Sequence, residues 1–264
     1  MRLFLFLLCC PVAIPIFAQQ PSESETRIRL NRHFFEIAAE DTASHVYDKL
    51  VSFSADSTKL ERIFTREGQV QRVVMTQPPR EEYYERVTDQ YNEYHELEWR
   101  KTENLHNGKF LTVYYFDGKV VGQVLSDSTT LYHVARNGES EPTQQNFNDF
   151  EPQIAVPTAE WHEFLFDNLR LSTGIRTDQP QIFWIAILVD EHGMAEQIEW
   201  ANPLGGNPKV AKQYLRVVRL WGNNYTPALD SFGNPVAKWL MIPFRVERAM
   251  RGTTKPIMIY SDFN

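Results

Sequence analysis

Hydrophobic and polar residues follow their clearest pattern in the last third of the chain, from 181 to 246. Residues 181–189 (QIFWIAILV) are almost wholly apolar and rich in β-branched and aromatic side chains, which predicts a strand covered on both faces. The turn sequence 190–193 (DEHG) follows, and apolar residues then alternate with polar ones from 194 to 200. This pattern predicts a β-hairpin whose returning strand has Met194, Glu196, Ile198 and Trp200 on one face. The second, wetter face is expected to carry Ala195, Gln197 and Glu199.

A helical period replaces the alternation after residue 203. Asn207 is suited to cap a helix, Pro208 fits its first position, and Gly222 is suited to end it. One face of this helix is expected to carry Val210, Ala211, Tyr214, Leu215, Val218 and Trp221. A second, shorter helix is predicted over 158–171, where Trp161, Phe164, Leu165 and Asn168 recur at helical spacing.

The last apolar run, residues 236–246 (VAKWLMIPFRV), predicts a further strand. Leu240, Ile242 and Phe244 share one face of it and are expected in the core. Pro243 removes a backbone donor near its end, which is tolerated best at the edge of a sheet. We therefore expect an edge strand whose main-chain groups are accessible to a second strand.

The order of these elements is helix, strand, strand, helix, strand (αββαβ). In this order, the segments VDEHG, KVAKQYLRVVRLW, YTPALDSFGNPV and IPFRV resemble the carboxyl-terminal domain of TonB-like energy-transducer proteins, over residues 158–248. The resemblance implies a small sheet with two helices packed on one face. It also implies that the last strand pairs with a short extended segment of an outer-membrane receptor, in transport related to the TonB system.

The main hypothesis is therefore a non-enzymatic module that binds an outer-membrane receptor or another envelope protein by β-strand addition. The expected docking residues are Val236, Lys238, Trp239, Leu240, Met241, Ile242 and Arg245. One alternative is a structural or assembly protein of the cell envelope, which forms a homodimer through the same edge. Another is an anchored TonB-type energy transducer, if the amino terminus is not cleaved.

The first residues predict a secretory signal over 1–18 and a location in the periplasm of a Gram-negative bacterium. A basic residue precedes the apolar run 3–8, and residues 16–18 (IFA) suit cleavage before Gln19. The run is too short for stable membrane insertion, because a spanning helix needs about 20 apolar residues. A lipoprotein acylated at Cys9 or Cys10, or a retained inner-membrane anchor, are the alternatives.

Short apolar runs broken by turn sequences predict a β-rich domain over 19–136. The turns are expected at Glu67–Gly68, Asn107–Gly108, Asp117–Gly118 and Asn137–Gly138. The Asn–Gly and Asp–Gly pairs suit two-residue hairpins, in which both central residues have positive φ. Successive hairpins of this kind form an antiparallel β-meander, and the fragment YYFDGK resembles the repeat units of MORN-like proteins. Residues 137–157 are polar and bounded by prolines, so we interpret them as a linker to a domain over 158–250, followed by a tail over 251–264. The predicted class is α+β.

Composition and motifs argue against catalysis and against nucleic-acid binding. The net charge of −7 disfavours an anionic partner such as nucleic acid. His95–Glu96 and His162–Glu163 lack the second histidine of a zinc-peptidase helix, and no nucleophile or phosphate-binding motif is present. The pair Glu81–Glu82 is interpreted as part of a solvated face, and the many aromatic residues from 83 to 116 as filling for a thin core. We expect no metal and no cofactor.

Overall fold

The structure of the protein is a computed structural model that describes residues 27–81, 83–127, 131–139, 141–169, 181–222 and 224–246. The predicted signal peptide at 1–18, the tail from 251 and Glu82 lie outside these residues. The fold is mostly β, with 47% strand, and the described part contains two helices and a large antiparallel sheet. The predicted α+β class is confirmed at this level.

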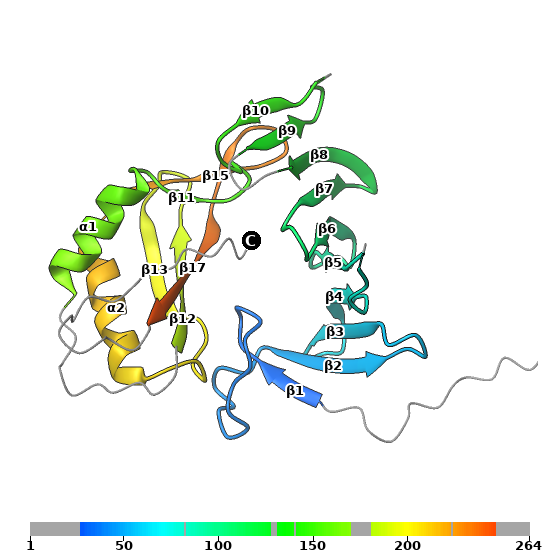
Figure 1. The fold of residues 1–264 in the computed structure, drawn as a ribbon, viewed down its shortest axis with the longest axis horizontal. Helices are drawn as coiled ribbons and strands as arrows, with labels where there is room; N and C mark the ends of the chain where they lie inside the picture. The colour runs from blue at the N-terminus through cyan, green and yellow to red at the C-terminus, as the bar shows by residue number, and fades with distance from the viewer. Residues whose placement is uncertain are drawn as a thin grey trace, which may run out of the picture.

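The larger sheet runs from β1 to β10, and each strand pairs with its neighbour in sequence, so the sheet is an antiparallel meander. We call it the large sheet. Figure 1 shows it as a curved wall on the right of the molecule. Its strands are β1 (Arg27–Leu30), β2 (Tyr47–Phe53), β3 (Lys59–Thr65), β4 (Val70–Thr76), β5 (Glu85–Tyr91), β6 (Leu97–Asn104), β7 (Phe110–Phe116), β8 (Lys119–Ser126), β9 (Tyr132–Arg136) and β10 (Thr143–Gln145).

The turns between these strands differ in detail from the prediction. Gly68, Gly108, Gly118 and Gly138 all have positive φ, but only at Gly118 does the preceding residue, Asp117, share it. The Asn107–Gly108 and Asn137–Gly138 turns are therefore not two-residue turns of the expected type. Before β4, the N–H of Gly68 donates to the carbonyl of Thr65 at 3.0 Å, and glycine alone is in the left-handed region there too.

The segment 137–157, which we interpreted as a linker, is packed against the rest of the protein. It contributes β10 to the large sheet, so this sheet continues past residue 136, and it contributes β11 (Gln153–Ile154), which pairs with β14. Phe150 is only 3% exposed and stacks on Tyr114, with 4.1 Å between the ring centroids. A single buried ring therefore anchors a segment whose composition is polar.

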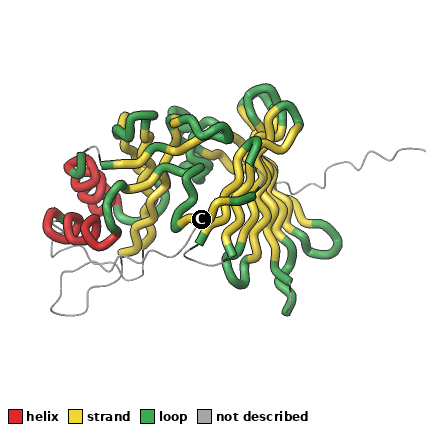
Figure 2. The backbone as a smooth tube through the Cα atoms, turned by 90° about the horizontal axis from the view of Figure 1, so that it is seen from above, coloured by secondary structure: helices red, strands yellow, loops and turns green. Residues whose placement is uncertain are grey.

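The carboxyl-terminal part has the element order α1 (Thr158–Asn168), β12 (Gln181–Val189), β13 (Ala195–Trp200), α2 (Pro208–Leu220), β14 (Tyr225–Thr226), β15 (Ala228–Leu229), β16 (Pro235–Val236) and β17 (Lys238–Val246). Three of its strands form an antiparallel sheet in the order β13-β12-β17, which we call the small sheet. The two helices cover one face of the small sheet, and the large sheet lies on the side of its other face (Figures 1 and 2).

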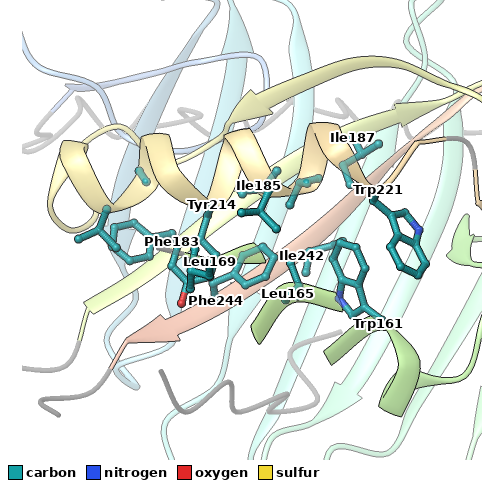
Figure 3. Close-up of a cluster of buried hydrophobic side chains, with 14 of the residues drawn as sticks. Trp161, Leu165, Leu169, Phe183, Ile185, Ile187, Tyr214, Trp221, Ile242 and Phe244 are labelled. Carbon is teal, nitrogen blue, oxygen red and sulfur yellow. The ribbon is translucent and has the colours of Figure 1, made fainter. Parts of the chain in front are cut away.

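The main hydrophobic core lies between the two helices and the small sheet (Figure 3). Trp161 of α1 and Tyr214 of α2 are fully buried there, and the Trp161 ring meets the ring of Trp221 edge to face at 5.0 Å. The side chain of Asn207 accepts a hydrogen bond from the N–H of Lys209, as expected of a helix cap. The shorter helix ends at Asn168, before the predicted 171.

Two predicted strands differ from the observed ones. A β-bulge between Leu188 and Val189 places Ala195 opposite Val189, so Ala195 packs on the core and Met194 is 41% exposed. The extra residue of the bulge exchanges the two faces beyond it, so the alternation expected from the sequence does not hold for Met194 and Ala195. Val236 does not belong to the last strand, because it pairs with Ala228 in the short hairpin of β15 and β16.

Candidate functional site

The strand β17 forms one edge of the small sheet. It pairs with β12 over its whole length in one antiparallel register, from Lys238 opposite Val189 to Val246 opposite Gln181. No other strand of the described residues pairs with β17. The main-chain N–H and C=O groups of β17 that do not bond to β12 therefore point to its outer side.

The hydrogen bonds of Trp184 on β12 show which groups these are. Its N–H donates to Asn202 Oδ1 at 2.7 Å, and its carbonyl accepts from the N–H of Ala201 at 2.7 Å. Both groups of Trp184 thus point toward β13 and away from β17. Pro243 lies directly opposite Trp184, so its own main-chain atoms point to the outer edge.

Because main-chain direction alternates along a strand, Trp239, Met241, Pro243 and Arg245 turn their main-chain groups outward, whereas Leu240 and Ile242 turn theirs toward β12. Proline supplies no donor, so the run with both a donor and an acceptor toward the edge is Trp239 and Met241, ending at the carbonyl of Pro243. Among the described residues, no backbone–backbone hydrogen bond to another segment involves Trp239 or Met241.

The side chains of the predicted docking residues divide between the two faces of the small sheet. Ile242 is 3% exposed and belongs to the main core, and Leu240 packs against that core from the same face. Trp239, Met241 and Arg245 lie on the opposite face, toward the large sheet. A strand beside β17 would therefore meet the side chains of this second group.

The loop between β1 and β2 packs on that second face. The ring of His33 meets the ring of Trp239 edge to face, with 4.6 Å between centroids, and His33 Nε2 lies 2.9 Å from Glu199 Oε2. The amide of Asn31 donates to the carbonyl of Ala201 at 2.6 Å in a buried contact. Burial lowers the pKa of His33, although the carboxylate of Glu199 acts in the opposite direction.

A second set of contacts joins the other end of the large sheet to the start of β17. Lys238 Nζ donates to the carbonyl of Phe150 and to Glu151 Oε1, both at 2.8 Å. Arg136 of β9 donates to Asp149 Oδ1 at 2.6 Å. The central carbon of its guanidinium lies 4.8 Å from the ring centroid of Phe150. Lys238 is therefore engaged within the protein, by the segment between β10 and β11.

Sequence reasoning did not identify the contact of His33 with Glu199 and Trp239. The histidine is separated from Glu199 by 166 positions, and only the fold brings them together. The one signal in the sequence was the polar alternation of β13, which placed Glu199 on its wetter face. That signal indicates a polar face but does not identify the residues that pack against it.

The remaining chemical candidates do not assemble into a site. His95 lies in a turn at a φ of 67°, and His162 lies on α1. Among the described residues, no group of three or more His, Cys, Asp or Glu side chains is placed to hold a metal ion. The aromatic residues from 83 to 116 do not all fill a core, since Tyr94 is 73% exposed while Tyr114 is stacked on Phe150.

Neither described helix is long and apolar enough to cross a membrane. Comparison with known proteins finds no matching family model, no matching curated protein and no matching solved structure.

Proposed function

We propose that the protein is a non-enzymatic periplasmic binding module that receives an extended segment of an outer-membrane receptor, or of another envelope protein, as an added strand beside β17. The observation that carries the proposal is the position of β17 at the edge of the small sheet, with the N–H and C=O groups of Trp239 and Met241 turned outward. The resemblance of residues 158–248 to TonB-like domains supports the same conclusion and links it to TonB-related transport.

Main-chain bonds to this edge supply only part of the affinity. Trp239 and Met241 offer two donors and two acceptors, and each hydrogen bond contributes roughly 0.5–1.5 kcal/mol net. The loss of translational and rotational freedom on association costs at least about 4 kcal/mol, which is comparable to the sum of these bonds. Side-chain contacts of the guest strand must therefore decide whether it binds and which guest is selected.

Titration of the ¹⁵N-labelled mature protein with synthetic peptides copying periplasmic amino-terminal segments of outer-membrane receptors tests the proposal. A guest strand should shift the amide signals of Trp239 and Met241 strongly, because their N–H groups gain acceptors. Peptide binding that shifts other amides and leaves these two unchanged would reject the docking edge.

The same edge could pair with a second copy of the chain, which is the alternative of an envelope assembly protein. Sedimentation velocity at several protein concentrations separates the two hypotheses. A protein that stays monomeric at high concentration and binds a receptor peptide supports the proposed module. A dimer whose formation blocks the peptide supports the assembly protein.

A further inference from the structure

One row of residues crosses the large sheet on the face that is turned toward the small sheet. The register places Lys49 opposite Ile63, Ile63 opposite Arg72, Arg72 opposite Gln90, and Gln90 opposite Trp99, so these side chains share one face. We call it the inner face, because the loop that follows β1 packs against it through Phe34 and against Trp239 through His33.

The inner face is rich in cations although the protein as a whole is acidic. Most of these cations have a carboxylate within ion-pair distance. Lys49 lies 2.9 Å from Glu36, Lys59 lies 3.1 Å from Glu61, and Lys101 lies 3.7 Å from Glu103. Arg86 also donates to Glu103, and Arg136 pairs with Asp149 at 2.6 Å.

Arg72 differs from all of these, because no carboxylate of the described residues lies within ion-pair distance of it. The Tyr47 hydroxyl and the exposed Glu98 raise the pKa of Arg72, but neither forms an ion pair with it. Burial lowers the pKa of the Arg72 guanidinium to about 10. A partly buried cation without a counter-ion is costly, and a bound anion offsets that cost.

Neighbouring side chains hold the Arg72 guanidinium in place. Its central carbon lies 3.8 Å from the ring centroid of Phe34 and 5.6 Å from that of Trp99, and its Nε donates to Gln90 Oε1 at 2.7 Å. Gln90 is itself only 7% exposed. Rings against a guanidinium leave its N–H groups directed outward in its own plane, and the groups on the two terminal nitrogens have no acceptor among the described residues.

Two consecutive residues of the loop after β1 connect this guanidinium to the proposed docking edge. His33 and Phe34 are consecutive residues, and the ring of the first contacts Trp239 of β17 while the ring of the second lies over Arg72. A strand added beside β17 turns alternate side chains toward the inner face. These side chains face the side of the small sheet on which the loop of His33 and Phe34 and the Arg72 guanidinium lie.

We infer that Arg72 is a carboxylate-binding site, and that its ligand is an aspartate or glutamate side chain of the segment that β17 receives. The second half of this inference rests on the proposed function. A guanidinium binds a carboxylate through two parallel N–H···O bonds, which Arg72 has free to offer. The guest is therefore an acidic extended segment, and Arg72 selects it over a neutral one.

A small ligand tests the site independently of strand addition. N-acetylglutamate and N-acetylglutamine, each with its α-carboxyl blocked as the N-methylamide, differ only in the side-chain carboxylate. The first should shift the side-chain Nε–H signal of Arg72 and the indole N–H signal of Trp99, and the second should not. In Arg72→Gln the shift of the Trp99 indole signal should vanish, and in Arg72→Lys, which keeps the charge and loses the planar fork, it should weaken. Arg62→Gln is the matched control, because Arg62 lies on the opposite face of the neighbouring strand and should leave the shifts unchanged.

Three results would overturn the carboxylate site: equal shifts with the acid and the amide, shifts that persist in Arg72→Gln, or tighter binding of inorganic phosphate than of N-acetylglutamate at Arg72. Circular dichroism of each variant establishes that it is folded before the comparison is made.

Peptides that differ only by glutamate or glutamine test the second half of the inference. Arg72→Gln should lower the affinity for the glutamate peptide roughly 10- to 100-fold, because a hydrogen-bonded charge is lost, and should leave the glutamine peptide unaffected. The amides of Trp239 and Met241 report the edge separately. Peptide binding at the edge that does not depend on Arg72 overturns the second half of the inference and leaves the proposed function. Binding of N-acetylglutamate at Arg72, with no peptide at the edge, overturns the proposed function and leaves the carboxylate site.

Discussion

Proline substitutions at two adjacent residues of β17 distinguish its outer side from its paired side. The N–H of Met241 points away from β12, whereas Leu240 lies opposite Ile187 in a hydrogen-bonded pair. Met241→Pro therefore removes an outward donor and no bond within the small sheet. Pro243 already occupies an equivalent outward position in the same strand, so the strand accommodates the ring there.

The two substitutions should differ in their effects on the unfolding free energy and on the affinity for a guest strand. Leu240→Pro leaves the carbonyl of Ile187 without its donor, which costs about 1–3 kcal/mol of unfolding free energy, and the ring adds a clash within the sheet. Met241→Pro should change the unfolding free energy much less. It should weaken guest binding at least about 2- to 10-fold through the single lost hydrogen bond, and further through the steric bulk of the ring.

Urea denaturation measures the first quantity, and peptide titration of each folded variant measures the second. Equal destabilisation by the two substitutions would contradict the assignment of inward and outward groups. A folded Met241→Pro protein that binds the guest with unchanged affinity would contradict docking at this edge.

Three further predictions concern stability. Trp161→Ala removes a fully buried ring and should lower the unfolding free energy by about 3–5 kcal/mol in urea denaturation. Asn207→Ala removes the cap of α2 and should cost about 1 kcal/mol in the same assay, with Asn207→Asp as the conservative control. Burial lowers the pKa of His33 below 6.5, with Glu199 opposing the shift and Arg32 adding to it. Protonation of His33 therefore favours the unfolded chain, so stability should fall as the pH drops below about 6.5, and less steeply in His33→Gln.

Local signals in the sequence were sufficient for the core of the small sheet. The nine residues 181–189, all apolar except Gln181, predict the observed bounds of β12, and the sequence Asn207–Pro208 predicts the start of α2. In both cases the signal lies within or next to the element itself. For β12 it is a continuous apolar run, and for α2 it is a capping residue before the first turn.

The large sheet was harder to predict because several of its turns lack glycine. His95 has a φ of 67° in the turn before β6, and the side chain of Asn92 accepts from the N–H groups of Tyr94 and Glu96. The hydrogen bonds to Asn92 stabilise a turn in which a residue other than glycine takes a positive φ, as glycine does at Gly118. Prediction from glycine positions alone therefore finds some hairpins of the meander and misses others.

The environment of Arg72 could not be predicted from the sequence at all. Its neighbours Phe34, Gln90 and Trp99 come from separate parts of the chain, and the register across β4, β5 and β6 brings two of them to it. A bulge at Gln90 and Tyr91 also interrupts the alternation that would assign faces. Contacts of this kind follow from the pairing of strands rather than from any local pattern.

The most direct test of a strand-accepting edge is residue-resolved amide hydrogen exchange along β17, in the free protein and with a bound receptor peptide. In the free protein, the amides of Trp239 and Met241 should exchange fast and those of Leu240 and Ile242 slowly, because only the latter two donate to β12. A bound guest should slow exchange at Trp239 and Met241. Uniform protection of all four amides before any guest is added, or no gain at Trp239 and Met241 when the peptide is bound, would contradict the account.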